Sequence, residues 1–341
     1  MNKISLREST TQDVITIADP QSEVYFDNYK EWFQSKNVTL YETKDKHPKL
    51  PKISIKNSEI CKNTKNVDIL IYIQSHWENI GKRSLLRETW ANRNVFRDIS
   101  VRIIFILGKP SKSSDQMKVK NENLAHHDII QGDFIDSFKN ITLKSILALH
   151  WINEHCLNSR YILKTDDDIF INIFALLEYM ISEIYSKNKV VMCQLKQNGT
   201  SPIMRDPKNK WYIPEEVFPG KTHFPQFCSG YTVLFTSDLI PDLYKTSFTA
   251  PYFSVDDVYV FGYLLPQIKS VQYEDVSNAL TLNTKSGLQE YEGNGPLVHV
   301  AVGAAEKGAM EKLWTRTLQK LSDWAKRHAK IVDVKNKQLV T

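Results

Sequence analysis

The sequence predicts an α/β protein built around an open, mostly parallel β-sheet. Apolar runs of strand length alternate with helix-length stretches between residues 67 and 195, which is the order found in sheets with helical crossovers. Several of these runs are apolar throughout, as is typical of strands buried on both faces. The chain has 341 residues, 42% of them hydrophobic, enough for one large domain or two modest ones.

The strands expected in this region are Asp68–Ser75, Val101–Leu107, Asp128–Ile130, Tyr161–Thr165 and Val190–Leu195. The helices expected between them are Gly81–Trp90, Gln116–Ala125, Ile141–His155 and Ile173–Ser186. The crossovers are expected to be right-handed. Ligand sites in such sheets lie beyond the carboxyl ends of the strands, so the residues that follow each strand are the first candidates for function.

The second half of the chain is less regular. The elements expected there are strands at Tyr231–Thr236 and Pro296–Val300, a short helix at Asp238–Ser247 and a long amphipathic helix at Ala304–Lys330. Residues 1–60 are rich in Ser, Thr, Asn and Lys and include a Pro-Lys stretch, which indicates a partly disordered stem or linker. We therefore expect the folded domain at residues 61–330 and a tail at residues 331–341.

Composition narrows the class of partner. A net charge of +5 is mild for this length; it favours no nucleic-acid partner and suits a small anionic substrate. Four cysteines and three N-glycosylation sequons, at Asn37, Asn140 and Asn198, indicate a secretory lumen, where disulfides persist. The cysteines allow three pairings. The sequence contains no run that predicts a signal peptide or membrane span, so we expect any targeting segment to lie outside this chain.

Three consecutive aspartates, Asp166, Asp167 and Asp168, follow the apolar strand Tyr161–Thr165, and a second apolar run follows at once. Carboxylates are the ligands that Mg²⁺ and Mn²⁺ prefer, and these ions leave positions open for phosphate oxygens. A solvated turn or a helix cap is the simpler explanation of an acidic triplet. Its place at the carboxyl end of a buried strand favours a functional site instead.

Further residues are candidates on weaker grounds. Asp256 and Asp257 stand at an expected helix start, where a carboxylate either stabilises the helix dipole or serves as a general base. His299 ends a strand-like run, and a single histidine there is more often packed than ligating. Arg83 and Arg87 are one helical turn apart, so they either bind one phosphate together or form a solvated basic face.

Several motifs in order resemble the β-1,3-galactosyltransferase / β-1,3-N-acetylglucosaminyltransferase family, and the likeness runs from about Cys61 to Leu318. The segments that carry it are Arg83–Trp90, Phe105–Gly108, Asp128–Phe134, Asp136–Phe138, Leu163–Asn172, Lys210–Tyr212, Phe227–Gly230 and Asp256–Val260. The resemblance implies a Rossmann-like, two-lobed glycosyltransferase A-type fold, with residues 61–330 as the catalytic domain. It also implies the disulfides Cys61–Cys156 and Cys193–Cys228.

The resemblance implies an inverting, metal-dependent hexosyltransferase. Asp168 and His299 would hold Mn²⁺ or Mg²⁺, while Asp166, Asp167 and the two arginines would lie at the UDP-sugar. Asp257, with Asp256 as the alternative, would be the catalytic base. The donor implied is UDP-galactose, with UDP-N-acetylglucosamine as the alternative, and the acceptor is a glycan on a glycoprotein or glycolipid. Family members are type II membrane proteins of the Golgi lumen, so contact with the membrane would come through an anchor that this chain lacks.

Two positions depart from the family pattern. Phe261 stands where the family usually has a glycine, and the family's further glycine after Gly230 is absent. A bulky Phe261 is expected to narrow the acceptor pocket or to shift the base. An inactive, glycan-binding relative is therefore the alternative to an enzyme.

Overall fold

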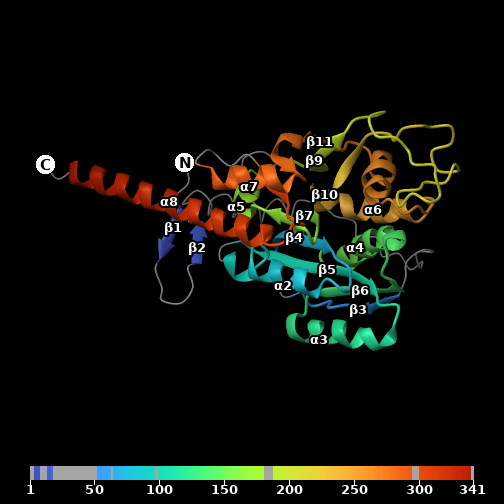
Figure 1. The fold of residues 1–341 in the computed structure, drawn as a ribbon, viewed down its shortest axis with the longest axis horizontal. Coiled ribbons are helices and arrows are strands. Elements are labelled where there is room, and N and C mark those ends of the chain that lie inside the picture. Colours follow the sequence, from blue (N-terminus) through green and yellow to red (C-terminus); the bar gives the residue numbers. More distant parts are fainter. Residues whose placement is uncertain are drawn as a thin grey trace.

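The computed structural model describes residues 4–7, 14–17, 52–62, 64–96, 99–179, 187–293 and 299–338. An eight-stranded sheet forms its centre, with the strand order β11-β9-β10-β7-β4-β5-β6-β3 (Figure 1). These strands are β3 (Ile53–Ile55), β4 (Val67–Gln74), β5 (Val101–Lys109), β6 (Ile129–Ile135), β7 (Ser159–Asp166), β9 (Val190–Lys196), β10 (Phe227–Thr236) and β11 (Gln272–Asp275). Most of the expected stem lies outside the described residues.

The middle of the sheet is parallel. Strand β4 pairs in parallel with β5 on one side and with β7 on the other, and β5 pairs in parallel with β6. The chain adds β5 and β6 outward from β4 and then returns to place β7 on the opposite side of β4. The carboxyl ends of β4 and β7 therefore meet at the topological switch point, where open α/β sheets bind their ligands.

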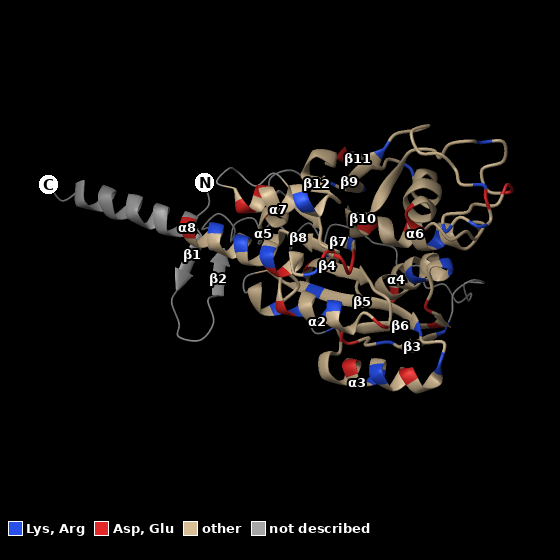
Figure 2. Cartoon of the chain, viewed as in Figure 1, with Lys and Arg blue, Asp and Glu red and all other residues tan. Residues whose placement is uncertain are grey.

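Both faces of the sheet are covered, which explains the continuous apolar runs in the sequence. On one face, α4 (Ile141–His155) and α6 (Ile240–Ser247) pack over alternate residues of β4 such as Leu70 and Tyr72. The other face carries Ile71 and Ile73 and packs against α2 (Ile80–Glu88) and the first turns of α8 (Ala309–Gln338). Many of the charged residues lie on the helices and loops around the sheet (Figure 2).

The remaining elements complete these layers. They are α3 (Gln116–His126), α5 (Ile173–Tyr179), α7 (Thr284–Glu292), a separate three-stranded sheet of β12 (Leu280–Thr281), β13 (Ala301–Gly303) and β8 (Ile169–Ile171), and a small pair of β1 (Ile4–Arg7) with β2 (Val14–Ile17). Strand β8 continues directly from the aspartate triplet, so the triplet joins the large sheet to the small one.

The expected α/β fold with a mostly parallel, Rossmann-like centre is confirmed, with three differences. Strand β10 runs antiparallel to both its neighbours and makes that half of the sheet mixed. Strand β3 pairs with β6, so part of the expected stem belongs to the folded domain. Helix α8 continues to Gln338, past the expected boundary at residue 330. Most of the strand expected at Pro296–Val300 falls in residues 294–298, which lie outside the described residues.

The expected disulfides are both present. Cys61–Cys156 joins the segment before β4 to the end of α4, and Cys193–Cys228 joins β9 to β10. Within the residues that the structure describes, no helix is long and apolar enough to cross a bilayer.

Candidate active site

The aspartate triplet lies at the switch point. Gln74, the last residue of β4, is paired with Asp166, the last residue of β7. The side chains of Asp166 and Asp168 are 35% and 39% exposed, whereas that of Asp167 is 7% exposed. The backbone carbonyl of Asp168 accepts a 2.7 Å hydrogen bond from the Ala304 amide, which fixes the turn between β7 and β8. Two carboxylates thus face the solvent and the middle one turns inward.

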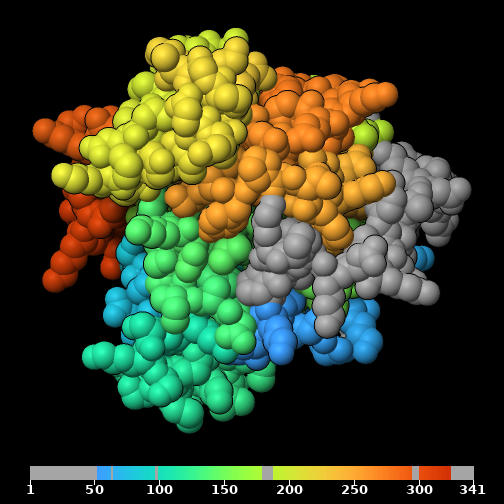
Figure 3. All heavy atoms as spheres, turned by 90° about the vertical axis from the view of Figure 1, so that its right-hand side faces the viewer, coloured from blue at the N-terminus to red at the C-terminus, as the bar shows by residue number. Residues whose placement is uncertain are grey.

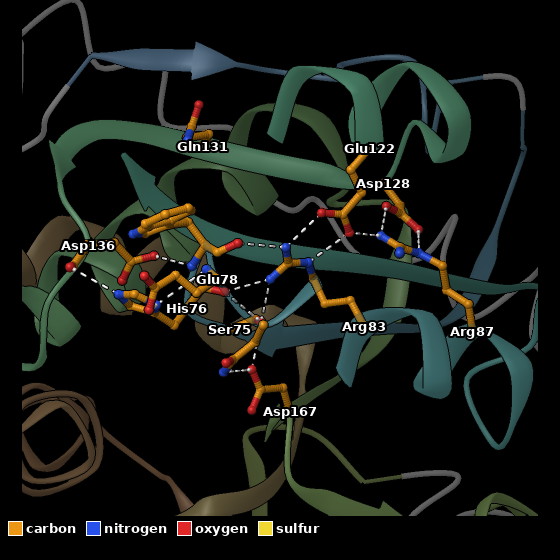
Figure 4. Close-up of polar contacts among 12 residues, drawn as sticks. Ser75, His76, Glu78, Arg83, Arg87, Glu122, Asp128, Gln131, Asp136 and Asp167 are labelled. Atoms are coloured by element: carbon orange, nitrogen blue, oxygen red, sulfur yellow. Dashed lines mark hydrogen bonds and ion pairs between the residues drawn. The ribbon is translucent and has the colours of Figure 1, made fainter. Parts of the chain in front are cut away.

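Asp167 joins the triplet by hydrogen bonds to the end of β4 and the beginning of α2. Its Oδ2 accepts hydrogen bonds from the Ser75 hydroxyl at 2.6 Å and the Asn79 amide at 2.8 Å. Its Oδ1 accepts one from Lys82 Nζ at 2.9 Å. These contacts join the ends of β4 and β7 (Figure 4). Asp167 was predicted to contact the nucleotide; the structure places both its oxygens against protein donors, where they orient its two neighbours.

Arg83 and Arg87 lie away from the exposed carboxylates. Arg83 is fully buried and donates to Glu122 at 2.8 and 2.7 Å, to the Ser75 hydroxyl at 2.8 Å, and to two backbone carbonyls of residues 76 and 77. Every N–H of its guanidinium is therefore used. Arg87 donates to Glu122 and to both oxygens of Asp128 (Figure 4).

The two arginines were expected to bind the donor, and in this structure their side chains contact protein carboxylates instead. Guanidinium groups suit phosphate because they donate as a planar fork, and here the forks are occupied by carboxylates of α3 and of the residue before β6. Arg83 instead connects Glu122 to Ser75, which in turn donates to Asp167. The two residues stabilise the loop between β4 and α2 from beneath.

Lys164 connects the triplet to the second acidic pair. Its side chain is 3% exposed, and Nζ lies 2.8 Å from Asp166 Oδ1 and 3.8 Å from Asp256 Oδ2. It also donates to the backbone carbonyl of Gly230. Burial disfavours its charge, but the surrounding carboxylates outweigh this and raise the pKa of Lys164. The structure therefore brings Asp166 and Asp256 together on one buried cation.

Asp257 begins the helical segment 258–264 and lies beside β10. Its Oδ1 accepts from the Val258 amide at 2.8 Å and its Oδ2 from the Gly230 amide at 3.3 Å. Burial, and then the neighbouring charge of Asp256, raise the pKa of Asp257 to about 6, although Lys164 opposes the shift. Such a carboxylate is largely ionised at neutral pH and is more basic than an exposed aspartate, as a general base must be.

Asp256 contacts a hydroxyl of α4 and the ammonium group of Lys164. Its side chain is 13% exposed, and its Oδ2 accepts a hydrogen bond from the Ser145 hydroxyl of α4 at 3.2 Å. Lys164 Nζ lies 3.8 Å from the same oxygen. The yellow part of the chain that follows β9 lies above the green part and beside the orange part in the space-filling view (Figure 3).

A comparison with family models now adds to this geometry. The model described as Galactosyltransferase matches residues 81–276, which include the triplet and the Asp256–Asp257 pair. The chain belongs to the galactosyltransferase family. Beta-1,3-galactosyltransferase 1 of Homo sapiens is 35% identical over 204 residues, which cover 60% of this chain and 62% of that protein. Beta-1,3-galactosyltransferase 5 of Pan troglodytes is 30% identical over 240 residues, covering 70% of this chain and 76% of that protein.

The matched region is thus less than two thirds of the length of the first of these relatives. Among solved structures, a glycosyltransferase involved in the glycosylation of the major capsid of PBCV-1 aligns with a TM-score of 0.39 and 9% identity, covering 74% of this chain and 99% of that one.

His299, another predicted site residue of this galactosyltransferase-family chain, contacts α7. Its Nδ1 pairs with Glu290 of α7, its amide donates to the same carboxylate at 2.9 Å, and its carbonyl accepts from Tyr291. Strand β13 runs antiparallel to β8 with Gly303 opposite Ile169, so His299 and Asp168 lie toward opposite ends of this pairing. In this structure His299 is paired with a carboxylate of α7, and its role as a metal ligand beside Asp168 stays a prediction.

The exposed carboxylates nevertheless fit a hard divalent cation. Mg²⁺ and Mn²⁺ are commonly held by one or two carboxylates together with substrate phosphates, so a complete protein cage is not required. Among the described residues no group of three or more His, Cys, Asp or Glu side chains is arranged to hold a metal ion. Asp168, whose nearest cation is Lys82 at 3.5 Å, has the most accessible carboxylate of the triplet.

The departure at Phe261 does not reach the site. Phe261 is 1% exposed and packs edge-on against Phe235, with ring centroids 6.0 Å apart, in the core beneath α6. The glycine required here is Gly262, because a Cβ at that position would stand 2.9 Å from the Cβ of Phe227. The expectation that Phe261 narrows the acceptor pocket or shifts the base is therefore wrong.

The sequence reasoning missed the lysines that organise the carboxylates. Lys164 interrupts an apolar strand, and a charge in a buried strand needs a partner, so the signal was visible. Lys82 directly precedes Arg83 and was not among the predicted site residues. Lys144, in the apolar helix α4, pairs with Asp136 at 2.6 Å and donates to the Ser75 carbonyl.

Proposed function

We propose that the chain is an inverting transferase that moves galactose from UDP-galactose to a hydroxyl of a glycan acceptor, forming a β-1,3 linkage. Membership of the galactosyltransferase family supports the sugar, since the relatives named above are beta-1,3-galactosyltransferases. The observation that carries the proposal is Lys164, which holds the donor-side carboxylate Asp166 and the acceptor-side pair Asp256–Asp257 around one buried ammonium group.

The chemistry follows from this arrangement. Asp257 accepts the proton of the acceptor hydroxyl as that oxygen attacks the anomeric carbon of galactose. The new carbon–oxygen bond forms on the face opposite the one from which UDP departs, so an α-linked donor gives a β-linked product. A single displacement needs no covalent intermediate. A carboxylate with a pKa of about 6 is well matched to this task, because it is ionised at neutral pH yet still basic.

Asp168 would hold the divalent cation, Mn²⁺ or Mg²⁺, which when bound supplies Lewis-acid stabilisation of the charge that develops on UDP. Asp166, fixed by Lys164, would face the ribose side of the nucleotide. Asp167, the Arg83–Glu122 pair and Ser75 keep the two exposed carboxylates in place from behind.

The acceptor is proposed to be a glycan of a glycoprotein or glycolipid in the Golgi lumen. The two disulfides suit an oxidising compartment. The sequon at Asn198 supports the same location, because Asn198 is exposed in the turn that follows β9.

The test is a UDP-release assay with UDP-galactose and UDP-N-acetylglucosamine, with and without Mn²⁺, over a panel of β-linked disaccharide acceptors. Metal-dependent release with UDP-galactose, and a β-1,3 linkage in the product by NMR, supports the proposal. Release with UDP-N-acetylglucosamine alone reassigns the donor. UDP binding without transfer to any acceptor indicates an inactive glycan-binding relative and overturns the proposal.

A further inference from the structure

Lys82 contacts the aspartate triplet, which Arg83 and Arg87 do not. It lies in the first turn of α2, and its side chain is 42% exposed. Its Nζ is 2.9 Å from Asp167 Oδ1 and 3.5 Å from Asp168 Oδ2, so one ammonium group touches both the buried and the exposed carboxylate. The Lys82 side chain ends in an ammonium group, which is cationic at neutral pH.

The other cations around the ends of β4 and β7 are committed to the protein. Arg83 uses all its donors, and Arg87 is paired with Glu122 and Asp128. Two lysines contact the triplet in the part of the chain that the structure describes, and Lys164 is 3% exposed while Lys82 is 42% exposed. Lys82 therefore combines charge, accessibility and a long flexible stem at this edge of the sheet.

We propose that Lys82 binds the diphosphate of the donor nucleotide and that, before the donor arrives, it occupies Asp168 in place of the metal. The inference rests on the proposed function, because it requires a nucleoside diphosphate at the triplet. Asp168 Oδ2 cannot serve an ammonium group and a divalent cation at the same time, since the two positive charges repel each other at contact distance. Lys82 would then leave Asp168 and bind a phosphate oxygen, while its contact with Asp167 keeps it near the site.

The two roles of Lys82 predict effects of opposite sign on two ligands. Lys82→Met removes the ammonium group that competes with Mn²⁺ for Asp168. Mn²⁺ alone should therefore bind several-fold more tightly, because the contact removed is an exposed ion pair of modest strength. The same variant lacks a charge-assisted contact to phosphate, so UDP in the presence of saturating Mn²⁺ should bind about tenfold more weakly. A purely structural role would weaken both ligands together.

The experiment is isothermal titration of wild type, Lys82→Met and Lys82→Arg with Mn²⁺ alone and with UDP at saturating Mn²⁺. Lys82→Arg keeps the charge and should bind UDP within about threefold of wild type. The matched control is Lys118→Met, because Lys118 is also a helical lysine paired with an aspartate, at 2.9 Å from Asp115, on α3 and away from the triplet. It should change neither affinity.

The outcomes separate the two proposals. If wild type binds UDP with Mn²⁺ and Lys82→Met binds it equally well, the role of Lys82 is overturned while the proposed function stands. Weaker binding of Mn²⁺ alone by Lys82→Met also overturns it. If wild type binds no UDP at millimolar concentration, the proposed function fails and the role of Lys82 fails with it. Circular dichroism of each variant establishes that the fold is intact.

Discussion

Gly230 and Asp257 lie so close together that a side chain at Gly230 would collide with the base. A Cβ on Gly230 would stand 2.7 Å from the Cβ of Asp257 and 3.3 Å from Lys164 Nζ. The Gly230 amide also donates to Asp257 Oδ2. The pairing of β10 with β9 shifts register between Cys228 and Val233, so Gly230 lies in an irregular stretch of β10. The position of Asp257, the proposed base, thus depends on residue 230 of β10 being a glycine.

We expect Gly230→Ala to lower kcat about 100-fold, because a displacement of about 1 Å of a catalytic group has an effect of this size. UDP binding should change little, since the exposed face of the triplet is untouched. Steady-state kinetics together with UDP titration measure the two effects. Gly81→Ala is the control: Gly81 is exposed in α2, a Cβ added there would meet no atom within 4 Å, and the change should stabilise the protein slightly. Unchanged kcat in Gly230→Ala would contradict this account of the base.

The pKa of Asp257 predicts the pH dependence of transfer. Because the carboxyl must be ionised to accept a proton and its pKa is raised to about 6, kcat/KM should fall about tenfold per pH unit below pH 6 and level off above it. Asp257→Asn should keep UDP binding and lose transfer at every pH. Near-normal transfer by this variant would move the assignment to Asp256.

The same pKa shift has a consequence for stability. A carboxyl whose pKa is higher in the folded state than in the unfolded chain destabilises the fold when ionised, so its penalty is absent below about pH 4 and complete above about pH 6. From the ordinary value of 3.8 to about 6, the cost is on the order of 3 kcal/mol at pH 8. Asp257→Asn should therefore unfold at higher denaturant concentration than wild type at pH 8. The gap should close at pH 4; a gap that widened there would contradict the shift.

Lys164 is expected to be essential for stability as well as for placing the carboxylates. Lys164→Met leaves Asp166 and Asp256 without their buried cation, and breaking a buried pair in this way costs about 3–5 kcal/mol. Urea unfolding measures the loss. Adding Asp166→Asn to Lys164→Met removes one of the unpaired charges, so the double variant should recover about 1–2 kcal/mol of it. Strictly additive losses would show that the two groups do not interact.

Much of the fold was readable from the sequence because its signals are local. The continuous apolar run of β4 predicted a buried parallel strand, and the helix Ile141–His155 has the same bounds in the structure. The position of the triplet at the end of β7 followed from the same reasoning. Strand β3 was missed because its residues, Ile53–Ile55, are a short apolar alternation within a polar segment, and pairing with β6 decides its conformation.

The site was less predictable because its partners are distant in the sequence. The motif around Arg83 is consistent with phosphate binding, and nothing local shows that Glu122, 39 residues away, takes the guanidinium. The bridge from Lys164 to Asp256 depends on how β7, β10 and the segment after α6 come together. The disulfides were predictable in advance through the family resemblance alone.

The disulfide beside Gly230 should affect activity more than the other one. Cys193–Cys228 closes a loop of 35 residues and Cys61–Cys156 one of 95, which predicts stabilisation of about 4 and about 5 kcal/mol. Loss of Cys61–Cys156 should therefore reduce stability at least as much as loss of Cys193–Cys228. Cys193–Cys228 lies at the irregular part of β10. The paired substitution Cys193→Ala with Cys228→Ala should therefore lower kcat more than Cys61→Ala with Cys156→Ala. Equal effects on kcat at matched stability would contradict a local role.

Asp168 and His299 should respond differently to substitution, although both were predicted as metal ligands. Asp168→Asn removes the charge of the most exposed carboxylate of the triplet and should abolish the Mn²⁺-dependence of UDP binding. His299→Ala should leave that dependence within about threefold of wild type, because His299 pairs with Glu290 at the far end of β13.

The cost of His299→Ala should appear in stability instead. Glu290, 17% exposed, would lose its histidine side-chain partner and keep the His299 amide, at a cost of about 1–3 kcal/mol. Thermal unfolding measures this loss, and adding Glu290→Gln should reduce it, since the carboxylate charge that faced His299 is then gone. UDP titration at several Mn²⁺ concentrations decides the ligand question. A His299→Ala variant that stayed folded yet lost Mn²⁺-dependent UDP binding would return His299 to the metal site and show that the end of β13 moves toward Asp168 when the donor binds.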